Sequence, residues 1–141
     1  MCIRDRLVGL QQAAWSGVDV RIILPGKNNH GFMSLVGAMF YEKLIESGVK
    51  IYLYEPSMIH QKSMIIDTWA TVGSSNLNHR SLFHDLEVDV VLSTTYARIH
   101  LENHFLNCLE QSEQISLESL RRHSWIKRLV GHLLLLGRYF L

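Results

Sequence analysis

Apolar and polar positions follow two different periods in the first part of the chain. Residues 7–16 and 32–47 carry apolar side chains three and four positions apart, a spacing that places them on one face of a helix. Residues 18–24 and 49–54 are short runs rich in β-branched and aromatic side chains, which favours strands. The order helix, strand, helix, strand is typical of a layered α/β fold.

The second part of the chain begins with strands and ends with helical periodicity. Residues 59–67 and 70–72 predict two strands, residues 73–76 predict a turn, and residues 86–92 predict a further strand. Residues 95–114 have the period of a helix. No stretch rich in Gly, Pro or Ser divides these elements, so we expect them to form one folded unit.

Composition adds an asymmetry of charge. The chain has 141 residues, of which 48% are apolar, and this is enough for one domain with a buried core. The net charge is only +1, but residues 1–120 hold nine Lys and Arg against all thirteen Asp and Glu, whereas residues 121–141 hold five Lys and Arg and no acid. An acidic body with a basic end indicates an anionic surface as a partner.

The C-terminal residues 115–141 form a basic tail with many apolar side chains. Its longest apolar run, Leu133–Leu136, is far shorter than the roughly 20 residues needed to cross a bilayer. Because Trp125 and Tyr139 accompany its basic residues, we predict an amphipathic helix that lies among the head groups of a membrane. The alternative is that this helix packs against another part of the protein.

The chemistry of the chain is concentrated in one motif, H-x-K-x4-D-x5-G-S-x-N, which runs from His60 to Asn76. Side chains alternate along a strand, so His60 and Lys62 should emerge on one face, whereas Asp67 has the opposite parity. The first two can converge on one phosphate. We expect Asp67 to brace the strand or a neighbouring loop.

The residue types of the motif suit the hydrolysis or transfer of a phosphodiester. Lys62 supplies a point charge for a non-bridging oxygen, and Ser74 and Asn76 can donate hydrogen bonds to the others as the phosphorus becomes pentacoordinate. A histidine can act as a nucleophile when neutral and as a general acid when protonated. His60 fits either role.

A carboxylate is needed to fix the tautomer of that histidine, and Glu87 is the best candidate. It has the opposite parity to Leu86, Val88 and Val90, which we expect to be buried. An inward-facing acid beside them would have to pair with a cationic or hydrogen-bonding group. The alternative is that Glu87 is a solvated strand residue.

The motif resembles the signature of the phospholipase D superfamily. From about residue 7 onwards, nearly the whole chain is similar to the C-terminal half of bacterial cardiolipin synthases. The likeness is carried by the strand before Leu-Pro-Gly-Lys at residues 24–27, by the H-x-K-x4-D segment, by Thr-Val-Gly-Ser-Ser-Asn-Leu at residues 71–77, by the acid before a V-x-V strand, and by the basic aromatic tail. We therefore expect an α/β fold with a mixed, largely parallel sheet flanked by helices. Residues 7–114 would form a phospholipase D-like catalytic half-domain, and residues 115–141 the amphipathic tail.

The resemblance also implies a reaction that needs no metal and no cofactor. Two such motifs form one site, in which one histidine attacks phosphorus to give a phosphohistidine, while the other protonates the leaving alcohol and then activates the incoming one. By position, His60, Lys62 and Asp67 are this half's catalytic motif, Ser74 and Asn76 bind phosphate, and Glu87 orients the histidine. The second motif usually supplies the acid and base, which favours that role for His60.

The implied substrate is an anionic phospholipid at the membrane surface of a bacterial cell. A phosphatidyl group would pass from one phosphatidylglycerol to another, giving cardiolipin and glycerol. The alternative is a phospholipase D-like phosphodiesterase or nuclease that is active as a homodimer. The acidic body has no pattern of basic and aromatic residues around the motif strand, so nucleic acid is the less favoured partner. A third possibility is a non-catalytic interaction module.

The sequence contains a single H-x-K, whereas this reaction needs two histidines. The second must come from a missing N-terminal half or from a second copy of the chain, so we expect the isolated monomer to be inactive. The opening residues Met1–Arg6 resemble translated adapter read-through. This favours a natural protein that continues upstream.

Four weaker candidates remain. Lys27 and His30 lie in a loop that resembles a segment bordering the active site in the family, and they could touch a head group or be solvated. His100 and His104 have the i, i+4 spacing of a zinc pair, but no third ligand follows in register, which favours an exposed amphipathic helix. We therefore predict no metal site.

Overall fold

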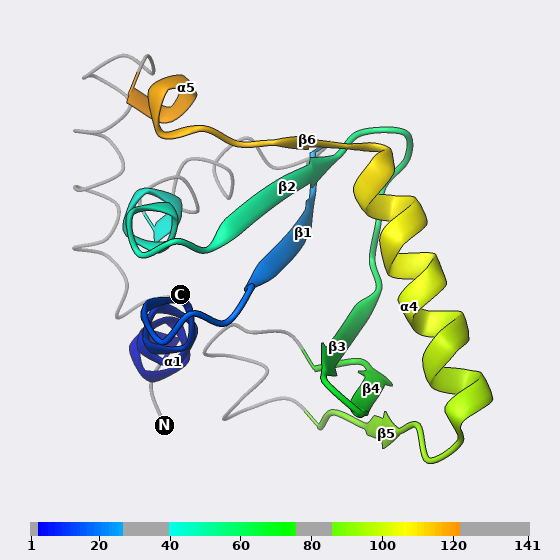
Figure 1. Ribbon diagram of the computed structural model, residues 1–141. Coiled ribbons are helices and arrows are strands. Elements are labelled where there is room, and N and C mark those ends of the chain that lie inside the picture. The colour runs from blue at the N-terminus through cyan, green and yellow to red at the C-terminus, as the bar shows by residue number, and fades with distance from the viewer. Residues whose placement is uncertain (1–2, 27–39, 76–85, 122–141) are drawn as a thin grey trace.

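The computed structural model describes residues 3–26, 40–75 and 86–121 of the chain. Figure 1 shows how its helices and strands are arranged. The elements are α1 (Ile3–Trp15), β1 (Arg21–Pro25), a helical segment at residues 40–46, β2 (Lys50–Tyr54), β3 (Lys62–Ile66), β4 (Trp69–Gly73), β5 (Asp89–Val91), α4 (Thr95–Glu110), β6 (Ser112–Gln114) and α5 (Leu117–Arg121).

The main body is built on a three-stranded sheet with the order β1-β2-β6. β1 runs parallel to β2, with Ile22 opposite Ile51, as is usual for strands joined by a helical crossover. β6 pairs with β2 in the antiparallel direction. In Figure 1, α1 and the helical segment lie on one side of these strands and α4 lies on the other.

The core lies where this sheet meets the helices that precede its strands. Ile51, in β2, is 0% exposed, and Val49, directly before that strand, is 1% exposed. Leu44 and Ile115 complete the buried cluster, and partly buried side chains of α1 and β1 pack around it. The β-branched runs that predict strands in the sequence therefore supply the centre of the core.

The motif strand belongs to a second sheet, with the order β3-β4-β5, in which both pairings are antiparallel. Asp67 and Thr68 form the two-residue turn between β3 and β4. The φ angle of Asp67 is 49°, in the left-handed region that Asp tolerates better than most residues. A connection this short can join only antiparallel neighbours, so the turn determines the direction of the hairpin.

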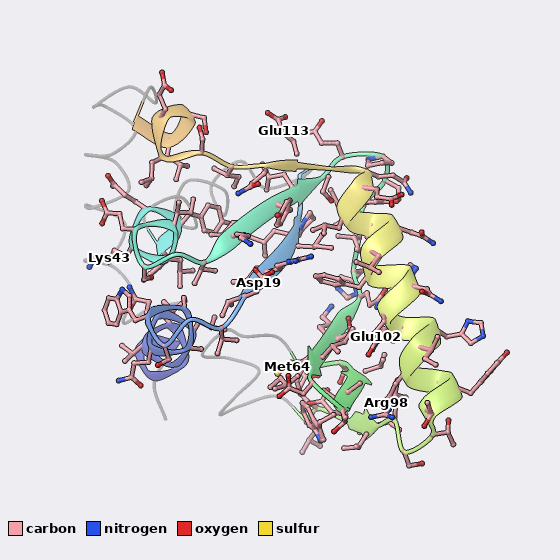
Figure 2. The ribbon with its side chains drawn as sticks, viewed as in Figure 1. Asp19, Lys43, Met64, Arg98, Glu102 and Glu113 are labelled. Atoms are coloured by element: carbon pink, nitrogen blue, oxygen red, sulfur yellow. The ribbon has the colours of Figure 1, made fainter. Side chains whose placement is uncertain are left out.

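α4 connects the two sheets. It begins after Thr94, whose Oγ1 accepts a hydrogen bond from the backbone N–H of Ala97 at 3.2 Å. It buries Leu101 and Cys108 and contacts β2 and β6. On the other sheet, Arg98 donates a hydrogen bond to the carbonyl of Thr68. Figure 2 shows Arg98 near the end of α4 that lies beside the β3–β4 hairpin.

The α/β class is confirmed and the β1-β2-β6 sheet is mixed, but the prediction of largely parallel pairing is wrong. Among the described strands only β1 and β2 are parallel. The predicted helix at residues 95–114 also ends early. It stops at Glu110, and residues 112–114 become β6 because Tyr52 and its neighbours in β2 offer them pairing partners.

The expected burial of Leu86, Val88 and Val90 is wrong as well. These side chains are 103%, 70% and 58% exposed. β5 covers only residues 89–91, and all three are exposed, so neither face of this strand is covered within the described part of the chain.

Within the three described ranges, no helix is both long enough and apolar enough to cross a bilayer. The predicted amphipathic helix of the tail lies almost entirely outside the described residues, which end with the short helix α5. Its membrane-facing role therefore stays a prediction.

Candidate active site for a phosphodiester

The structure brings His60 and Lys62 together on one face at the start of β3. The Lys62 Nζ lies 3.1 Å from His60 Nδ1 and 3.0 Å from His60 Nε2, and it donates a hydrogen bond to the His60 carbonyl at 2.8 Å. His60 is exposed and Lys62 is partly buried. The alternation of a strand explains why residues two apart meet.

The contact leaves both groups able to act on a ligand. The two imidazole nitrogens point in diverging directions, and a neutral imidazole has an acceptor lone pair on only one of them. One ammonium equidistant from both therefore makes a close electrostatic contact and no single linear hydrogen bond. A phosphate placed beside this pair would meet a cation and an exposed imidazole at the same point. These are the two groups that the motif predicts for a phosphodiester.

The turn after β4 lies next to the same strands. The backbone N–H of Ser74 donates to the Val88 carbonyl at 3.0 Å, and the backbone N–H of Val88 donates to Ser74 Oγ at 3.0 Å. A hydroxyl has one donor and two acceptor positions, so Ser74 keeps an O–H to offer a phosphate oxygen. The turn is thus fixed to the segment before β5 by bonds that do not use up its donor. Asn76 lies outside the described residues.

Asp89 is a neighbour of this turn that the sequence analysis missed. Lys62, Gly73 and Asp89 occupy directly opposed positions on β3, β4 and β5, so they share one face of the sheet. Asp89 Oδ1 accepts a hydrogen bond from the backbone N–H of Ser75 at 3.3 Å. The signal in the sequence was weak, because only the paired register shows that Asp89 faces a glycine.

The remaining members of the motif lie further away. Asp67 occupies the exposed turn at the opposite end of β3 from His60, so any influence on the chemistry would pass through the hairpin. Glu87 is partly buried just before β5. Among the described residues the ring of His60 is contacted by Lys62, and a bond from Glu87 to that ring stays a prediction.

Two of the weaker candidates, Lys27 and His30, lie outside the described residues. Within the described part of the chain, no group of three His, Cys, Asp or Glu side chains converges as a metal site would require. The two helical histidines contact other partners. The His100 ring packs on Tyr96 with the ring centroids 4.4 Å apart, and His104 contacts Gln61.

An α/β body with a His-x-Lys pair at the start of β3 and a Gly-Ser turn after β4 fits a phospholipase D-like domain. The crystal structure of Nuc, a phospholipase D family member from Salmonella typhimurium, has the same fold, with a TM-score of 0.66. The match covers 77% of this chain and 72% of that one, at 21% sequence identity. The family described as "Cardiolipin synthase, PLD-like domain" matches residues 3–109, and the chain belongs to it.

Similar proteins of bacterial origin carry the same description. A cardiolipin synthase of Clostridium perfringens (strain SM101) is 36% identical over 124 residues, which are 87% of this chain and 26% of that protein. A cardiolipin synthase of Halalkalibacterium halodurans is 34% identical over 127 residues, which are 89% of this chain and 25% of that protein. The chain thus spans about a quarter of the length of the curated relatives it matches.

Proposed function

We propose that this chain supplies one half of the active site of a phosphatidyltransferase that makes cardiolipin and glycerol from two molecules of phosphatidylglycerol. The observation that carries the proposal is the contact between the Lys62 ammonium and both nitrogens of the exposed His60 imidazole. The pair lies in a domain of the cardiolipin synthase family. The Gly-Ser turn follows the neighbouring strand β4, and its Ser74 hydroxyl is able to donate to a phosphate oxygen.

The reaction has two steps that share one phosphorus. The histidine of the other motif, which this sequence does not contain, attacks the phosphorus of the first phosphatidylglycerol and forms a P–N bond, while the bond from phosphorus to the glycerol oxygen breaks. His60 donates a proton to that oxygen, so glycerol leaves as a neutral alcohol. His60 then takes the proton from a hydroxyl of the second phosphatidylglycerol, whose oxygen attacks phosphorus and releases the histidine.

Lys62, Ser74 and Asn76 act on the non-bridging oxygens in both steps. Negative charge grows on these oxygens as the phosphorus becomes pentacoordinate, and donors already in place stabilise that charge without reorganising. Glu87 orients the imidazole of His60. Asp67 supports the hairpin that carries the pair, since it forms the turn at the far end of β3.

The second histidine comes either from another part of a longer chain or from a second copy of this one. The support is twofold: the sequence holds a single H-x-K, and it spans only about a quarter of the length of its relatives. The basic tail at residues 115–141 would hold the site against the anionic membrane surface, where phosphatidylglycerol is found. The protein would then be a peripheral protein of the bacterial cell membrane.

Lipid analysis of cells that lack their own cardiolipin synthases tests this function. The complete gene encoding this chain should restore cardiolipin, and His60→Ala should lower the rate of synthesis by about 100- to 10,000-fold, the usual range for the loss of a general acid and base. His100→Ala is the matched control, because that ring packs on Tyr96 of the same helix.

The other outcomes of this experiment would assign a different function to the protein. If lipids do not change but DNA or another phosphodiester is cleaved only with His60 intact, the chain is a phospholipase D-like phosphodiesterase or nuclease. If neither activity depends on His60, the domain is an interaction module. If the purified His60→Ala variant still forms cardiolipin, the proposed chemistry is wrong.

A further inference from the structure

The residues before β3 are not positioned by strand pairing. The register between β3 and β4 begins at Lys62 opposite Gly73, so His60 and Gln61 precede the ladder. Among the described strands, those of the motif sheet pair with one another and not with the main body. Another contact must therefore define where the His60 imidazole lies relative to the rest of the fold.

α4 supplies such a contact through His104. The Nε2 of His104 lies 2.8 Å from the Oε1 of Gln61, although the two residues are 43 positions apart in the chain. An amide oxygen can only accept, so the imidazole donates from Nε2. The amide nitrogen of Gln61 in turn donates to Ser63 Oγ at 3.1 Å. Both ends of the Gln61 amide are thus bonded.

Gln61 stands between the two catalytic residues in sequence. Because side chains alternate, its amide points to α4 while His60 and Lys62 point to the opposite side. The hydrogen bond from His104 holds Gln61 on the side opposite to His60. It therefore limits rotation of the backbone that carries the imidazole. The other bond from α4 to this hairpin, from Arg98 to Thr68, is at the far turn and cannot do this.

The ring of His104 is itself held on the helix. Cys108, one turn later, has its Sγ 3.7 Å from the same Nε2 and is 6% exposed, so it anchors that side of α4 in the body. The chain of contacts runs from the buried Cys108 through His104 and Gln61 to the backbone beside His60. It joins the catalytic segment to the main body at the point where strand pairing has not begun.

We propose that His104 is a positioning residue that acts through Gln61 to hold the His60–Lys62 pair in its reactive geometry. The inference rests on the proposed function, because it assumes that this pair does chemistry on a phosphodiester. A small displacement of a reacting group is enough to slow catalysis strongly, so loss of the bond should lower kcat by about tenfold. KM should change less, since Lys62 is held within the β3–β4 ladder and Ser74 follows another strand.

The test uses the complete gene product and measures cardiolipin formation in mixed micelles of phosphatidylglycerol and detergent. The variants are His104→Ala, His104→Gln, Gln61→Ala and the double variant His104→Ala/Gln61→Ala. Gln places an amide donor close to the position of Nε2, so His104→Gln should recover most of the lost kcat. The double variant should be no slower than Gln61→Ala alone, because both changes remove the same bond. His100→Ala should match the wild type.

Three results would overturn the inference. One is an unchanged kcat in His104→Ala, measured while His60→Ala is inactive. Another is additive losses in the double variant, which would mean that the two residues act separately. The third is an equal loss in His104→Gln and His104→Ala. If His104→Ala does not fold, kcat is compared between His104→Gln and Gln61→Ala. The inference then requires a lower kcat in Gln61→Ala than in His104→Gln. Activity that persists in His60→Ala would refute the proposed function, which is a different outcome from all of these.

Discussion

Gly73 should tolerate no side chain, although nothing in its backbone conformation forbids one. A Cβ added there would overlap the Asp89 carboxylate, the Val88 carbonyl oxygen and the Asp89 Cα. The last two belong to the backbone, which cannot move away without loss of the pairing between Gly73 and Asp89 and of the bond from Ser74 to Val88. Gly73→Ala therefore has to separate β4 from β5.

The size of the effect follows from the overlap. Overpacking of this kind destabilises proteins by about 1–3 kcal/mol. With a denaturant slope of about 2 kcal/mol/M, the urea midpoint of Gly73→Ala should fall by roughly 0.5–1.5 M. Separation of the strands should also break the two bonds between Ser74 and Val88 and displace the Ser74 hydroxyl, so the variant should bind inorganic phosphate or glycerol phosphate more weakly in calorimetry.

Gly9 provides a matched control with the opposite sign. It lies within α1, and a Cβ added there meets nothing within 4 Å. Gly9→Ala should therefore stabilise the chain by about 0.5–1 kcal/mol, since Gly is a poor helix former. A Gly73→Ala variant as stable as the wild type would refute the close approach of β5 to Gly73. So would midpoints of the two variants that move in the same direction.

Two further predictions concern the main body. Hydrogen bonds from Arg21 and Lys50 lower the pKa of the Asp19 carboxyl to about 2. Because the folded pKa lies below the unfolded value of 3.8, the ionised carboxyl stabilises the fold above pH ~4, and this stabilisation is lost as pH falls to ~2. The difference in urea midpoint between the wild type and Asp19→Asn should therefore disappear between these two pH values. The side chain of Ile51 is 0% exposed. In the same assay, Ile51→Ala should lower the free energy of unfolding by about 2–5 kcal/mol and Ile51→Val by about 0.5–1.5 kcal/mol. Equal losses in the two variants would contradict the place of Ile51 in the core.

The strand β2 and the shared face of His60 and Lys62 could be predicted from the sequence because both depend on residues that are close together in the chain. The β-branched run at residues 49–54 predicts β2, which is where the structure has it, and Val49 and Ile51 form the centre of the core. Alternation along a strand predicts that His60 and Lys62 share a face, and their side chains meet. The chemistry of the motif could be inferred for the same reason, since its residue types and spacing are all within one segment.

The directions and partners of the strands did not follow, because they depend on contacts between distant segments. Periodicity extended the helix of α4 to residue 114, but pairing with β2 turned residues 112–114 into β6. Alternation in residues 86–92 predicted a buried apolar face, but β5 is an edge strand and Val88 is exposed. The pattern of apolar and polar residues in a sequence indicates which side chains share a face, but it does not indicate what covers that face.

The sequence by itself determined the α/β class and the family, and it predicted the pair of groups that we propose acts on phosphorus. Only the tertiary structure decided that Asp89 faces Gly73 and that His104 reaches Gln61, 43 positions away. The physical reason is that the residues of the motif meet through the repeat of one strand, whereas these partners meet only after β5 and α4 have packed beside β3. No spacing in the chain encodes such a meeting.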